Sequence, residues 1–158
     1  MRIAFALVII SLSLGSGGVL AAGDPGSSSR METPKDPVLE KVAAATSRQD
    51  WAGAQSLLQD ALSKDAGNAD YHNLYAYSIR KGPNPDMSLV FKHYNEALRI
   101  DPKHRGAHEY LGEAYLMVGN VAKAKEQLGA LDRLCFFGCS EFTDLKKAIA
   151  EHEKQATK

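Results

Sequence analysis

Small and apolar residues recur at a nearly fixed spacing through most of this chain of 158 residues. Intervals of 36 and 34 residues separate Ala54, Val90 and Ala124. The same two intervals separate Leu58, Tyr94 and Leu128, and again Ala61, Ala97 and Leu131. Within each unit, the three- and four-residue steps between these positions are typical of one face of a helix. A period of roughly 34 residues indicates stacked helical pairs, because one pair alone cannot bury its apolar face.

Turn signals divide this pattern into helices. Pro37 suits a first helical turn, where its missing N–H needs no partner, and Asp50 is placed to cap the next helix. The stretch Gly82-Pro83 ends the third helix, and Asp101-Pro102 ends the fourth. Between them we expect Asn84 to cap the fourth helix, with Pro85 in its first turn.

The segment 94–128 carries one helix-turn-helix period in a characteristic order of small, aromatic and turn residues, namely Ala97-Leu98, Pro102, Leu111-Gly112, Tyr115, Gly119, Ala124 and Leu128. This order resembles the tetratricopeptide repeat, and the resemblance covers about residues 37 to 136. It implies an all-α, right-handed α-α solenoid of about three helical hairpins, at residues 36–67, 68–104 and 105–136, within a domain of residues 36–155. An amphipathic helix at about 140–155, starting at Ser140 or Thr143, is expected to cap the array.

The first 22 residues have the pattern of a secretory signal peptide. Arg2 precedes an uncharged run from Ile3 to Leu14, and small residues follow at Ala21 and Ala22. An uncleaved membrane anchor is the alternative, although Ser and Gly enrich the second half of the segment. Residues 23–35 are rich in Gly, Ser and Pro and predict a flexible leader. We therefore expect a periplasmic or secreted protein without stable membrane insertion of the mature chain.

The composition favours proteins as partners. The chain has 19 basic and 19 acidic side chains, so nothing in its charge predicts binding to nucleic acid or to an anionic membrane. It carries no Ser, His and Asp set, no phosphate-binding glycine loop and no paired buried carboxylates that sequence alone would predict. We expect a protein that is not an enzyme and needs no cofactor.

The resemblance also predicts where a partner binds. In tetratricopeptide proteins the first helix of each pair lines the surface that holds a peptide or a partner helix. In this chain that surface is expected to include Glu40, His72, Asn73, Ala76, Arg80, Glu109, Tyr110, Glu113 and Met117. Asn73 matches a position at which chaperone-binding members hold a peptide carboxylate, but acidic residues stand where that site needs basic ones. Tyr110 is the expected aromatic anchor.

Two further groups invite a functional interpretation. Cys135 and Cys139 are four residues apart around Gly138, which favours a disulfide staple in an oxidising compartment; inert free thiols, or a thiol-redox or metal-handling role in the cell envelope, are alternatives. His104 and His108 stand at helical spacing and offer two metal ligands, but turn contact and partial burial explain both positions equally well. We expect no metal site.

Overall fold

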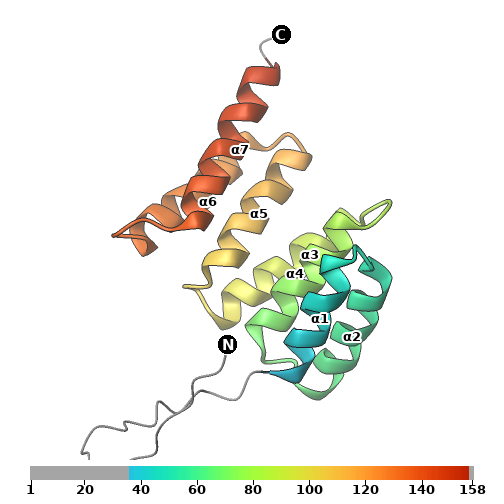
Figure 1. Ribbon diagram of the computed structural model, residues 1–158. Coiled ribbons are helices and arrows are strands. Elements are labelled where there is room, and N and C mark those ends of the chain that lie inside the picture. Colours follow the sequence, from blue (N-terminus) through green and yellow to red (C-terminus); the bar gives the residue numbers. More distant parts are fainter. Residues whose placement is uncertain (1–35, 157–158) are drawn as a thin grey trace, which may run out of the picture. The chain divides into compact units, whose positions relative to one another are not determined.

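The computed structural model describes residues 36–156, so the predicted signal peptide 1–22 and leader 23–35 lie outside the described residues. The described part is all-helical and contains no strand (Figure 1). Its helices are α1 (Pro37–Ser47), α2 (Trp51–Lys64), α3 (Ala69–Lys81), α4 (Met87–Ile100), α5 (Arg105–Met117), α6 (Val121–Leu134) and α7 (Ser140–Ala156). Between residues 36 and 156, no helix combines the length and the apolar character that crossing a membrane requires.

Neighbouring helices pack in the order of the chain. The pairs α1 with α2, α3 with α4, and α5 with α6 form three hairpins, and α2 packs on α3 as α4 packs on α5 (Figure 1). Helix α7 lies against both α5 and α6 and so covers the end of the third hairpin. The predicted α-α solenoid with a closing helix is confirmed.

Polar side chains at the helix starts account for most of these boundaries. The six helices of the three hairpins each begin after a residue whose side chain accepts a backbone N–H of the first turn: Asp36, Asp50, Asn68, Asp86, His104 and Asn120. Such caps satisfy donors that have no partner inside the helix. At the other end of α5, Gly119 adopts a φ of +74°, which suits a residue without a Cβ.

The predicted start of α4 was wrong by two residues. Asp86, not Asn84, caps the helix, and its Oδ1 accepts from the N–H of Ser88 at 2.9 Å. Asn84 instead has a φ of +53°, a left-handed conformation that asparagine tolerates better than most residues. Pro85 then precedes the cap and is not in the first turn. The chain therefore completes its reversal before the helix begins.

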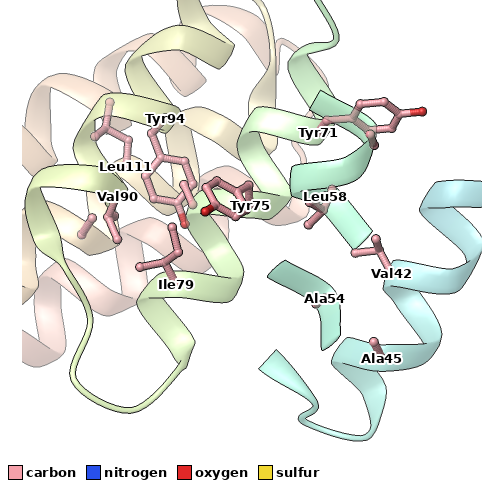
Figure 2. Close-up of a cluster of buried hydrophobic side chains, with 13 residues drawn as sticks. Val42, Ala45, Ala54, Leu58, Tyr71, Tyr75, Ile79, Val90, Tyr94 and Leu111 are labelled. Carbon is pink, nitrogen blue, oxygen red and sulfur yellow. The ribbon is translucent and has the colours of Figure 1, made fainter. Parts of the chain in front are cut away.

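The core consists of two clusters of buried side chains. The larger one runs through α1 to α5, where Val42, Leu58, Val90 and Tyr94 have no exposed surface (Figure 2). The smaller one joins the end of α5 to α6 and α7 and includes Leu131 and Leu145. Several alanines are also completely buried, at positions 54, 76, 97, 107, 114 and 124. Small residues at these positions allow the helices to approach closely.

Gly112 marks a close approach between two helices. In the structure it lies against Leu145 of α7. A Cβ built on Gly112 would lie 2.5 Å from Cδ2 and 2.7 Å from Cδ1 of Leu145. Leu145 is fully buried and has little room to move.

Replacing Gly112 by alanine is therefore expected to destabilise the fold by about 1–3 kcal/mol, because the added methyl overlaps a packed leucine. The matched control is Gly129→Ala on α6, where the nearest atom is Nη1 of Arg133 at 3.8 Å and the methyl fits. This control should gain roughly 0.5–1 kcal/mol from the better helix propensity of alanine. Urea unfolding followed by circular dichroism measures both; equal shifts in the two variants would contradict the packing of α7 on α5.

Candidate functional site

Arg80 of α3 joins three residues of the predicted partner surface into one cluster. Its Nη2 lies 2.7 Å from Oε2 of Glu113, and its guanidinium carbon lies 5.6 Å from the ring centroid of Tyr110. The same carbon lies 5.6 Å from the ring centroid of Tyr77, and the two tyrosine rings are 4.8 Å apart. The arrangement places a cation against two aromatic faces and a carboxylate, all of which stabilise it.

Beneath this cluster, Tyr94 anchors Arg80 from α4. The Nε of Arg80 donates a hydrogen bond to the hydroxyl oxygen of Tyr94 at 3.2 Å, and the Arg80 side chain is only 6% exposed. Burial alone would lower the pKa of Arg80, but Tyr94 and Glu113 outweigh it and raise that pKa. The guanidinium therefore stays charged and ties α3, α4 and α5 together.

Glu109 lies one helical turn before Glu113 on α5 and has no cation of its own. Within residues 36–156 its carboxylate makes no hydrogen bond and no ion pair, although the residue is partly buried. Burial, and then the charges of Glu113, Asp144 and Glu141, raise the pKa of Glu109 to about 7, with Arg80 acting in the opposite direction. The side chain is therefore only partly ionised at neutral pH.

We define the binding face as five side chains on α3 and α5: Tyr77, Arg80, Glu109, Tyr110 and Glu113. Tyr77, Glu109, Tyr110 and Glu113 are each partly exposed, and only Arg80 is buried. Tyr110 also packs on the larger core cluster, and burial raises its pKa to about 12. Truncation of Tyr110 is consequently expected to lower stability, in contrast to truncation of a freely exposed aromatic residue.

Three other predicted residues of α3 are buried where we expected an accessible surface. Ala76 is completely buried in the core, and Asn73 is 5% exposed. The Asn73 amide nitrogen lies 3.5 Å from where a Cβ on Gly106 would stand, so this side chain fills the seam between α3 and α5. His72 is 8% exposed and contacts His93 of α4. Direct contact of these three residues with a partner stays a prediction.

The remaining predicted residues lie apart from Arg80. Glu40 is exposed on α1, and no contact joins it to the binding face. Met117 is 52% exposed at the end of α5 and lines a shallow hollow with Ala148 and His152 of α7. It follows Tyr110 by two helical turns, so the two lie on the same side of α5.

Sequence reasoning missed Tyr77 as a member of this face. A signal was present, because Tyr77 precedes Arg80 by three residues and therefore shares its side of α3. The Trp51 ring of α2 extends the aromatic group, with its centroid 6.0 Å from that of Tyr77. The effect of Asp144 and Glu141 on the pKa of Glu109 could not be predicted from the sequence, because it depends on how α7 docks.

The cysteine pair forms the expected disulfide. Cys135 and Cys139 are bonded, with their Cα atoms 5.5 Å apart, and Gly138 between them has a φ of +85°. Phe136 and Phe137 of the enclosed loop are 87% and 97% exposed. A disulfide staple agrees with this geometry, whereas thiol exchange stays a prediction.

Both nitrogens of His104 and of His108 already have protein partners. His104 caps α5 through Nδ1, and its Nε2 lies 3.0 Å from Asp70. His108 contacts Gln127 at 2.8 Å and the carbonyl oxygen of Pro102 at 3.1 Å. No group of three or more potential ligands suited to a metal ion occurs in the part of the chain that the structure describes.

Comparison with solved structures identifies the fold. A domain of yeast Sti1, described as the TPR2B domain in a pHsp70 complex, superposes with a TM-score of 0.65 at 18% identity, covering 75% of this chain and 94% of that one. The type III secretion translocator chaperone SycD of Yersinia enterocolitica superposes with a TM-score of 0.62 at 15% identity, covering 75% and 87%. Neither the models of protein families nor the curated proteins give a match. The chain has the tetratricopeptide-repeat fold.

Two ion pairs of equal length allow a test of how burial changes the contribution of an ion pair to stability. Glu113 to Arg80 and Glu96 to Arg99 are both 2.7 Å, but the Arg99 side chain is 69% exposed and that of Arg80 only 6%. Glu113→Ala is expected to destabilise the protein by about 2–3 kcal/mol, because it leaves a buried cation without its counter-ion. Glu96→Ala should change the unfolding free energy little, since water solvates its partner. Similar losses in the two variants would contradict the structural role of Arg80.

The contact between His72 and His93 predicts a pH dependence. The carbonyl oxygen of Ala66 accepts from Nε2 of His72 at 3.1 Å, so Nδ1 of His72 must accept from Nδ1 of His93, 2.8 Å away. Burial, and then the charges of His72 and Lys92, lower the pKa of His93 to about 4. The unfolded state, with a pKa near 6.5, therefore binds more protons between these values, and stability falls as the pH falls from about 6.5 to about 4.

We expect His93→Gln, which keeps a donor for His72, to remove this part of the pH dependence. Urea unfolding of the wild type and the variant at several pH values gives the difference between their unfolding free energies. Both proteins contain Glu109, so its titration contributes equally to both and does not affect this difference. The wild type should lose its advantage over His93→Gln as the pH falls through this range. A constant difference would contradict the depressed pKa of His93.

Proposed function

We propose that this protein is an interaction scaffold whose binding face on α3 and α5 holds a peptide or a segment of another protein. The observation that carries the proposal is the group of partly exposed tyrosines fixed in place by a buried arginine. Tyr77 and Tyr110 offer apolar rings with polar tips and lose little freedom on binding, because Arg80 already orders both. Side chains of this kind dominate the binding energy of many protein interfaces.

The structural neighbours support a binding role over a catalytic one. The Sti1 domain is described in complex with pHsp70, and SycD is described as a translocator chaperone. Their identity to this chain is below one fifth, so they support the mode of binding and not the identity of the partner. Accordingly, we propose a binding role without a reaction or a cofactor.

Export is part of the same proposal. The N-terminal pattern of a signal peptide and the bonded Cys135 and Cys139 both favour an oxidising compartment outside the cytoplasm. A partner would then be met in the periplasm or outside the cell. Cleavage of the chain near Ala21 or Ala22 in secreted material, read by N-terminal sequencing, tests this part independently.

Selection of short peptides from a random library, followed by mapping of a selected peptide through amide chemical shifts, tests the binding face. The shifts should concentrate on the binding face and extend along α5 to Met117, which lies on the same side of this helix as Tyr110. Met117→Ala should then weaken binding at least about five-fold, or about 1 kcal/mol. Met117 is 52% exposed, so this variant should keep its stability.

The control is Phe137→Ser, which alters the exposed disulfide loop and should leave peptide binding unchanged. Absence of any selected peptide would refute the proposed function. Loss of binding in Phe137→Ser together with full binding in Met117→Ala would move the site to the loop.

A further inference from the structure

The carboxylates on and beside the binding face are only partly matched by cations. Glu113 is paired with Arg80, and Glu141 of α7 lies 3.6 Å from Arg105. Glu109 and Asp144 have no cation partner within residues 36–156. One carboxylate on the face, that of Glu109, and one beside it, that of Asp144, therefore lack a counter-ion among the described residues.

Glu109 is the more informative of the two because it is partly buried. Asp144 is exposed and water solvates it, whereas burial and three neighbouring carboxylates make the ionised form of Glu109 unfavourable. A cation brought to this position from outside would remove that penalty. A positively charged ligand would thus stabilise the ionised carboxylate of Glu109.

Arg80 is an independent observation of what this face accepts. The chain places its own guanidinium against the rings of both Tyr77 and Tyr110 and pairs it with Glu113. Tyr110 and Glu113 follow Glu109 on α5, with Glu113 one helical turn away, so the groups that hold a guanidinium are already assembled next to Glu109. That position is filled, while the one at Glu109 is open.

Asn73 points to the same ligand chemistry. It is 5% exposed, and its amide oxygen has no hydrogen-bond donor among the described residues. It lies one turn before Tyr77 on α3, in the seam beside Gly106 of α5. This buried oxygen is an acceptor without a donor, and a ligand carboxylate would only add one more acceptor to a face that already holds several.

We infer that the binding face takes a protein segment bearing arginine or lysine side chains, one of which forms an ion pair with Glu109 beside the ring of Tyr110. This inference rests on the proposed function and names the class of its partner. It also predicts rejection of acidic segments, because Glu109, Glu113 and Asp144 would repel them.

The peptides selected from the random library provide the first test. Their sequences should be enriched in Arg and Lys over the starting library. A matched peptide in which citrulline replaces each Arg keeps the shape but loses the charge, and it should bind at least about ten-fold more weakly. If the selected peptides bind to this face but lack basic residues, the inference is overturned while the proposed function stands.

Glu109→Gln provides the second test. This variant should weaken binding of the Arg peptide about five- to ten-fold and leave binding of the citrulline peptide unchanged. The matched control is Glu126→Gln on α6, an exposed glutamate outside the face, which should bind both peptides as the wild type does. Equal effects of Glu109→Gln and Glu126→Gln on the Arg peptide would place the cation elsewhere and refute the assignment.

The pH dependence of binding adds a readout that a merely structural role of Glu109 would not produce. Because the pKa of Glu109 in the free protein is about 7, its ionised fraction falls as the pH falls through that value. The Arg peptide should therefore bind more tightly at about pH 8 than at about pH 6 in the wild type. Glu109→Gln should lose this difference, and its persistence in the variant would contradict the ion pair.

Discussion

Close packing of helices through small side chains is the constraint on which this structure depends. Six alanines have no exposed surface, and Gly112 admits Leu145 where even a methyl group would overlap it. Helices α2 to α7 are consequently each packed on at least two other helices and not on a hairpin partner alone. This explains why a seventh helix is needed: without α7, Leu131 and the end of α5 would lose the cover that the smaller core cluster provides.

The same close packing explains how a charged side chain becomes part of the core. Arg80 stands on α3 where the helices come together, so its guanidinium meets Tyr94 from α4 and Glu113 from α5. With these partners the Arg80 guanidinium links three helices. It also orders Tyr77 and Tyr110, which remain partly exposed. Stability and binding are therefore connected at this point, because the residues that present the aromatic surface also complete the packing beneath it.

The distribution of charge distinguishes this face from one built to hold a carboxylate. Arg80, the one arginine of the face, is already paired with Glu113. Asn73, beside the face, is buried, and its amide oxygen has no hydrogen-bond partner among the described residues. Glu109, partly buried and repelled by its neighbours, is the group that gains most from an incoming cation. A shared fold with a domain described in a pHsp70 complex thus leaves room for a different ligand chemistry, since function depends on the side chains of the site.

Much of the fold was readable because it depends on local rules. Helical spacing, the cap at Asp50, Gly119 at the end of α5 and the recurrence of small residues are properties of short segments. The error at Asn84 was also local: Asn84 and Asp86, two positions apart, are both good capping residues, and only the geometry of the turn chooses between them. Pairing of Cys135 with Cys139 followed from their spacing within one turn.

The sequence by itself determined the repeated helical pairs and many of the small and apolar positions that the helices bury, such as Ala54, Leu58 and Val90. The tertiary structure decided which of the candidate residues remain accessible, because burial depends on how far neighbouring helices approach. It buried Asn73, Ala76 and Arg80, left Tyr110 partly exposed, and brought α7 close enough for Asp144 and Glu141 to change the pKa of Glu109. Electrostatic effects of this kind act through space between segments distant in the chain, so no local pattern encodes them.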